Sequence, residues 1–321
     1  MRKIFYIIQI LGLLILFTGC NDLIYDDLSD CEQGVNFTFY AQTPCQTGPS
    51  YPAEIKQVRV FAFDSKNILV EVYEDKSAVL APEYLLKTFF NQLGTFTFVA
   101  WGGTDLDSYD FSSFEKNKTT KDQMLVSLKR QSDQFPANAE PLYYGVSEPL
   151  TVIDRTDEGS FFDLVKFNMQ ELTNRITFNI QGLSETADYS VTITDDNGVY
   201  DFDANFAPDS RFDYITDVYR DQGNLLANFS VMKLAENRNT HLTIKNITTG
   251  KVVYEVNLID DLILYTGDTG MKPPYSLECD HDFIVIIKFI DDPEGDETHI
   301  RLEVNVNDWN VINRTVILGL E

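Results

Sequence analysis

Short runs of alternating apolar and polar residues recur along most of the chain. Such alternation places every second side chain on one face, as a half-buried β-strand requires, in residues 35–41, 56–64, 94–101, 173–180, 189–194 and 301–306. Val58, Val60 and Ala62 share one side of the second run, so that side is expected to form core. Turn residues separate the runs, and Asp196-Asn197-Gly198 is a strong two-residue hairpin signal. The pattern predicts an all-β fold of antiparallel β-sandwiches.

One segment, residues 119–130, has helical rather than strand spacing. Thr119 or Thr120 can cap its N-terminus, and Met124 and Leu128 lie on one helical stripe. Basic residues stand at the end of the segment, where their positive charge interacts favourably with the negative end of a helix dipole. The segment therefore predicts a short surface helix.

The length of the chain indicates two domains. After the N-terminal signal described below, about 300 residues remain, which is more than one hydrophobic core usually supports. The strand pattern begins again near residues 161–171, so we expect an N-terminal domain over 31–165 and a C-terminal domain over 166–321. Residues 20–30 are acidic and lack strand periodicity, which predicts a tether.

The first twenty residues have the form of an export signal. Met1-Arg2-Lys3 precedes an apolar run over residues 4–17 and the sequence Thr18-Gly19-Cys20, which resembles a bacterial lipoprotein signal. This resemblance implies that residues 1–19 are removed by cleavage between Gly19 and Cys20, and that Cys20 carries the lipid. A single membrane span is the alternative, but the apolar run is shorter than the ~20 residues that cross a bilayer. We expect an outer-membrane lipoprotein, exposed at the cell surface.

Charge and composition exclude several function classes. The chain has 50 acidic and 25 basic residues, a net charge of −25, so a nucleic-acid partner is not expected. The sequence has three histidines and contains no nucleophile, phosphate-loop or zinc-protease motif. We therefore expect no enzyme, no cofactor and no small-molecule substrate. The acidic residues 291–297 lack the spacing of calcium loops, so no metal site is expected.

Three cysteines follow Cys20. A Cys31–Cys45 bridge would close a loop of about 15 residues, but the expected strand at residues 35–41 lies between the two and spans ~20 Å. The flanking segments would have to fold back for this bridge to form. Whether Cys31 and Cys45 are bridged or not therefore stays open. Cys279 adjoins an apolar run and is expected to be a buried thiol.

Several strands and turns occur in the order found in one known family. The chain resembles the FimB-like fimbrial anchor lipoproteins of the type V pilus system of Bacteroidota in residues 25–31 with Gly34-Val35, 94–103, 143–145, 174–176 and 306–309. The resemblance implies two transthyretin-like β-sandwich domains in tandem. It also implies a non-enzymatic subunit that attaches a fimbrium to the outer membrane and exchanges strands with pilin subunits.

The resemblance also implies a role for the first strand. In the resembled system, polymerising pilins are cut after their first strand by a protease specific for Arg or Lys, and this opens a groove for a neighbour's strand. No Lys or Arg occurs here between Asn21 and Ile55. We therefore expect the strand that carries Val35, Phe37 and Phe39 to stay in the mature protein and to fill its own groove.

The last segment, residues 309–320, is a candidate donor strand. The alternation of Val304 and Val306 changes phase at Asn307-Asp308, so a bulge or turn is expected before Trp309 and Val311. An edge strand can pair with another chain, whereas an ordinary last core strand is the alternative. Two other functions remain open, namely a surface glycan-binding lipoprotein and a stalk or tip pilin.

Overall fold

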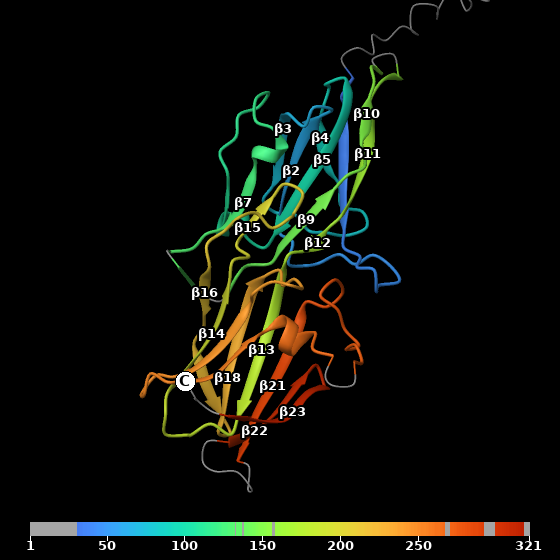
Figure 1. Cartoon of the computed structure of the whole chain (residues 1–321). Coiled ribbons are helices and arrows are strands. Elements are labelled where there is room, and N and C mark those ends of the chain that lie inside the picture. Colours follow the sequence, from blue (N-terminus) through green and yellow to red (C-terminus); the bar gives the residue numbers. More distant parts are fainter. Residues whose placement is uncertain are drawn as a thin grey trace, which may run out of the picture.

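The computed structural model describes residues 31–131, 133–136, 138–155, 158–266, 270–291 and 299–317, and it is built almost entirely of β-strands. Figure 1 shows two stacked parts, with the first strands of the chain in the upper part and the last strands in the lower part. The all-β prediction is confirmed. Most neighbouring strands are antiparallel, but β1 and β11, β13 and β21, and β8 and β16 pair in parallel.

The upper part is a sandwich of two sheets. A three-stranded sheet has the order β11-β1-β4, and a larger sheet has the order β12-β9-β5-β2-β3 with β10 paired to β5. Their strands are β1 Gln33–Tyr40, β2 Gln57–Asp64, β3 Leu69–Asp75, β4 Leu86–Phe89, β5 Gly94–Gly103, β9 Leu142–Val146, β10 Leu150–Val152, β11 Phe161–Asn168 and β12 Gln170–Glu171.

The lower part also has two sheets, in the orders β17-β18-β13-β21-β22-β23 and β20-β19-β14-β16-β8. A π-helix at Ile259–Ile263 follows β20. The strands are β8 Gln134–Pro136, β13 Thr173–Gln181, β14 Tyr189–Asp195, β16 Phe212–Ile215, β17 Val218–Asp221, β18 Asn224–Met232, β19 His241–Asn246, β20 Val252–Asn257, β21 Asp282–Asp291, β22 His299–Val306 and β23 Trp309–Ile317.

A small fifth sheet joins the two parts, and it contradicts the helix predicted at residues 119–130. It has the order β15-β7-β6, with β6 Tyr109–Phe111, β7 Leu125–Leu128 and β15 Val199–Asp201. Single-turn 3₁₀-helices at Leu106–Ser108 and Lys121–Gln123 precede β6 and β7. The helical prediction was wrong because β7 pairs on both sides with segments far away in the sequence, which override local propensity.

The two expected domains are therefore interleaved. Strand β11 runs through the expected boundary at residues 165/166 and stays paired with β1 as far as Asn168. Strand β8, from the first half of the chain, pairs with β16 in the lower part. The change from the upper to the lower part comes only at β13.

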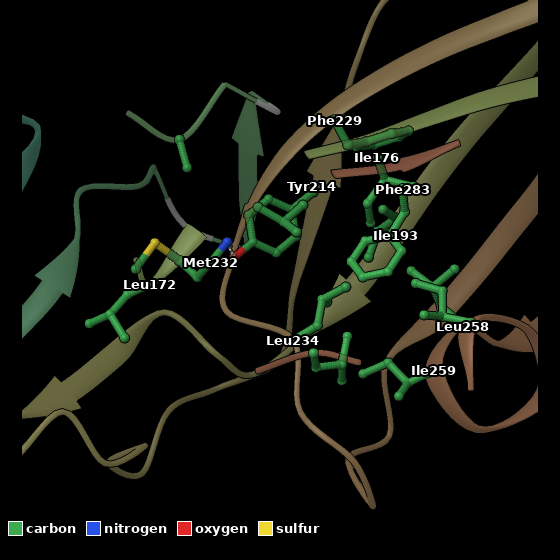
Figure 2. Close-up of a cluster of buried hydrophobic side chains, with 14 of the residues drawn as sticks. Leu172, Ile176, Ile193, Tyr214, Phe229, Met232, Leu234, Leu258, Ile259 and Phe283 are labelled. Carbon is green, nitrogen blue, oxygen red and sulfur yellow. Dashed lines mark hydrogen bonds between the residues drawn. The ribbon is translucent and has the colours of Figure 1, made fainter. Parts of the chain in front are cut away.

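Both faces of β2 are buried, although the alternation predicted one core face. Val58, Val60 and Ala62 pack between the two upper sheets with residues of β1, β5 and β11. Phe61 and Phe63, both 0% exposed, belong to a second cluster that continues into the lower part. Figure 2 shows a portion of that cluster, where Ile176, Phe229, Phe283 and their neighbours fill the space between the lower sheets.

Candidate functional site: the first and last strands

The first strand, β1, is the centre of its sheet. It pairs in parallel with β11 along its whole length, from Gln33 to Tyr40, and antiparallel with β4 from Gly34 to Phe37. Alternate residues face the core because strand side chains have a period of two. Val35, Phe37 and Phe39 are 0%, 0% and 1% exposed, respectively. The strand occupies the space between β4 and β11 with its backbone and fills the core below with these side chains.

Aromatic rings fix the position of β1 over the larger upper sheet. The ring of Phe37 lies 5.0 Å from that of Phe98 in an edge-to-face arrangement, and 5.7 Å from that of Phe167. Phe39 stacks on Phe167 at 5.3 Å and lies 6.0 Å from Tyr84. Burying each such side chain stabilises the fold by roughly 1.5–3 kcal/mol, so removal of β1 from this groove is strongly unfavourable.

Polar contacts hold both ends of β1. The hydroxyl of Thr88 on β4 donates to the carbonyl of Val35 at 2.8 Å in a buried position. At the other end, the backbone N–H of Gln42 donates to Asn168 Oδ1 at 2.9 Å, and Asn168 Nδ2 donates to the carbonyl of Gln42 at 3.0 Å. Gly34 allows close approach, since a Cβ there would lie 1.9 Å from the carbonyl oxygen of Thr88.

The first basic residue after the tether, Lys56, has a hydrogen-bonded backbone. Its N–H donates to the carbonyl of Gly103 at 2.9 Å, and its own carbonyl accepts from the N–H of Ala78 at 2.8 Å. The Lys56 side chain is exposed, but the peptide is held between two other segments rather than in a free loop. The loop between β1 and this point contains no Lys or Arg.

The structure contradicts the Cys31–Cys45 bridge, and it also contradicts the buried thiol at Cys279. Cys45 is bonded to Cys279, with Cα atoms 5.9 Å apart, whereas Cys31 is a free, half-buried thiol. Cys31 and Cys45 lie beyond opposite ends of β1, and an eight-residue strand separates its ends by about 25 Å. A disulfide needs Cα atoms within about 7 Å, so the length of β1 keeps Cys31 and Cys45 too far apart to bond.

A cavity of about 360 Å³ lies beside this disulfide, between the upper and lower parts. Gln42, Tyr143, Glu171 and His281 are among the residues that line it. Burial is the largest influence on His281, and it lowers the pKa of that imidazole below its usual value of 6.5. In the described ranges, no three His, Cys, Asp or Glu side chains are grouped so that they could hold a metal ion.

The last strand, β23, lies at the edge of its sheet, whereas β1 lies at the centre of its own. It pairs with β22 from Trp309 to Ile317 and, within the described part of the chain, has no strand on its other side. Val311 is 7% exposed, and Trp309 packs against the core while partly exposed. In the described part of the chain, β23 is therefore an edge strand with apolar side chains at its start.

The turn before β23 confirms the predicted change of phase. Asn307 and Asp308 have φ values of 46° and 65°, as a two-residue hairpin turn requires, and the register shifts between Val304 and Asn305. Asn307 also bonds β21, because its Oδ1 accepts from the N–H of Ile284 at 2.8 Å and its N–H donates to the carbonyl of Ile284 at 2.9 Å.

Other predicted features fall partly outside the described residues. Gly19, Cys20 and the tether lie before the first described residue, Cys31, and most of the acidic segment 291–297 is likewise not described. Among the described residues, none of the helices has the length and apolar character needed to cross a membrane. Trp101 is 0% exposed and cannot stack on a sugar.

Comparison with known proteins identifies the family. A family model described as fimbrillin-A associated anchor proteins Mfa1 and Mfa2 matches residues 28–315. The chain belongs to this anchor family. It is 29% identical over 312 residues to the minor fimbrium anchoring subunit Mfa2 of Porphyromonas gingivalis, an alignment that covers 94% of each chain.

Solved structures agree with the family assignment. The fimbrial anchor protein Mfa2 from P. gingivalis superposes with a TM-score of 0.76 at 25% identity, covering 88% of this chain and 100% of that one. A candidate polysaccharide-binding protein of Bacteroides thetaiotaomicron gives a TM-score of 0.68 at 22% identity, with 88% and 97% coverage, and shares the fold. The resemblance to fimbrial anchors drawn from the sequence is confirmed, and the family is one of structural subunits.

Proposed function

We propose that this anchor-family protein is a lipoprotein that joins a fimbrium to the outer membrane and ends the fibre there. Its last strand would pair with a pilin subunit, and its own groove would accept none. The observation that carries this proposal is the position of β1, which is central in its sheet and continuous with the chain that follows.

A filled groove limits assembly because strand exchange needs an unpaired edge. The groove between β4 and β11 is occupied by β1, which pairs with β11 along its whole length and with β4 from Gly34 to Phe37. The stretch from Asn21 to Ile55 offers no Lys or Arg to a protease with that specificity. The subunit could then donate a strand but not receive one, which places it at one end of a fibre.

Lipidation of Cys20 is the proposed attachment to the membrane. Cys20→Ala should move the protein, and any fimbriae attached to it, from the membrane fraction to the culture medium. The measurement is immunoblotting of membrane and medium fractions after a carbonate wash, with Cys31→Ala as the matched control that keeps the lipid. A Cys20→Ala protein that stays in the washed membranes would contradict the proposal.

Retention of β1 can be tested separately by mass spectrometry of the protein from native membranes. We expect an acylated N-terminal peptide that begins at Cys20 and a chain that is continuous through Lys56. A mature N-terminus after Ala41 would instead identify a polymerising stalk or tip pilin, because its groove would then be open.

A further inference from the structure

The disulfide found here joins the two ends of the fold. Cys45 lies in the loop that follows β1, and Cys279 lies immediately before β21, although the two are separated by 234 residues in the sequence. Figure 1 shows the blue segment after β1 and the orange segment before β21 near the junction of the upper and lower parts. Nearly all of β2 to β20 lies in the covalent loop that this bond closes.

We propose that the Cys45–Cys279 disulfide carries the tension of the fibre directly from the first strand to the last sheet. This inference rests on the proposed function, because tension at both ends arises only if the N-terminal side is attached to the membrane and β23 to a pilin. The covalent path then runs from β1 through Cys45 and Cys279 into β21, β22 and β23. Residues 46–278 lie outside this path.

Without the bond, the same tension would pass through the whole middle of the chain. The force would leave β1 toward β2 and reach β21 only through the intervening strands, which are held by hydrogen bonds that are individually weak in water. Full extension of the segment between the cysteines, which are 234 positions apart, would lengthen the protein by about 800 Å. The bond prevents this extension because a covalent link bypasses those strands.

The bond also sets the direction in which tension acts on β1. It holds the end of β1 that follows Tyr40, while the N-terminal side pulls on the end at Gln33. Tension then acts along β1 from both ends, and its separation from β11 and β4 is not needed to transmit the force. The Asn168 contacts with Gln42 keep the same end of β1 in place.

A second consequence concerns cleavage of the backbone. A cut at any peptide bond between Cys45 and Cys279, including the bond after Lys56, leaves β1 covalently joined to β21. An exported protein meets the oxidising conditions in which such disulfides persist. The bond therefore preserves attachment even after the exposed loops of the middle region have been cut.

Single-molecule pulling of residues 21–321, the chain that follows the lipid-bearing Cys20, with a peptide handle at each end, tests the proposal. Under oxidising conditions the wild-type protein should release only chain outside residues 46–278. Addition of a phosphine reductant should add about 800 Å to the total released length. The double variant Cys45→Ser/Cys279→Ser should release the longer length without reductant.

The matched control is Cys31→Ser, which removes the free thiol and should behave as the wild type does. If the oxidised wild-type protein releases the longer length, the proposal is wrong. The comparison of oxidised and reduced wild type decides the question even if the double variant does not fold.

A test on cells separates this inference from the proposed function. Fimbriae remaining after controlled shear should fall severalfold in cells that carry the double variant, but not in cells that carry Cys31→Ser. Equal retention in both strains would overturn a role of the bond in holding fibres. If Cys20→Ala also leaves fimbriae attached, the anchor function itself fails, whatever the pulling experiment shows.

Discussion

The first and last strands of the chain differ in how completely they are paired. Strand β1 has a neighbour on each side and three side chains in the core, whereas β23, among the described strands, has one neighbour and forms the edge of its sheet. Removal of β1 would expose two strands and a hydrophobic groove. Removal of β23 would take Val311 and Trp309 away from the core, but β22 would still pair with β21.

This difference suggests a division of roles between the two ends. A strand with two partners and buried aromatic side chains resists exchange, because every hydrogen bond and apolar contact must be lost before a replacement enters. An edge strand already presents free N–H and C=O groups, which can pair with another chain. The predictions below test this contrast, beginning with the largest effect.

Deletion of residues 311–321 should abolish capture of the pilin while the rest of the protein stays folded. The physical reason is that the deletion removes most of β23, yet β22 remains paired with β21. The measurement is co-purification of pilin with the detergent-extracted protein, alongside circular dichroism.

A shorter deletion of residues 318–321 is the control, since it leaves all of β23 and should retain capture. Insoluble protein after the longer deletion would show instead that β23 is an ordinary core strand, and unchanged capture would exclude it as the donor.

Phe37→Ala should lower the free energy of unfolding by about 3–5 kcal/mol, because it leaves a cavity among Phe98, Phe167 and Tyr73. Chemical denaturation monitored by fluorescence gives the value. Phe89→Ala on the neighbouring strand is the matched control, since that side chain is 60% exposed and its loss should change the value by about 0.5 kcal/mol or less. Equal effects would mean that β1 is not packed as described.

Gly34→Ala should destabilise the protein by about 1–3 kcal/mol, because the new methyl group would force β1 away from the carbonyl of Thr88. Gly48→Ala makes the same chemical change where no atom lies within 4 Å of the new Cβ. Thermal melts of both variants would measure the difference, and similar melting temperatures would argue against the close pairing of β1 with β4.

Tyr84→Phe should lower the free energy of unfolding by about 1 kcal/mol or less, the smallest of these effects. Burial raises the pKa of Asp75, but hydrogen bonds from Tyr84, at 2.6 Å, and from Ser77 outweigh it and hold that pKa below 3.8. A carboxyl group with a lowered pKa stabilises the fold above about pH 4 and loses this contribution as the pH falls through its folded value. Denaturation midpoints should therefore differ at pH 7 and converge toward pH 2, and a constant difference would contradict this origin.

Much of the fold could be predicted from local sequence. The alternation in residues 35–41 and 56–64 identified β1 and β2, and the change of phase at Asn307-Asp308 identified the turn before β23. Local spacing failed at residues 125–128, where pairing with β6 and β15 replaced the expected helix by a strand. It also missed that Phe61 and Phe63 lie in a second core, since alternation cannot tell whether one or both faces of a strand are covered.

The sequence by itself determined the strand periods, the turns, the family resemblance and the absence of basic residues between Asn21 and Ile55, because each of these depends on short segments of neighbouring residues. Only the tertiary structure decided that β1 lies between β4 and β11, that β23 is an edge, and that Cys45 pairs with Cys279. These features depend on contacts between residues far apart in the chain. Which distant residues pair is fixed only when whole sheets pack together, so local sequence patterns do not predict it.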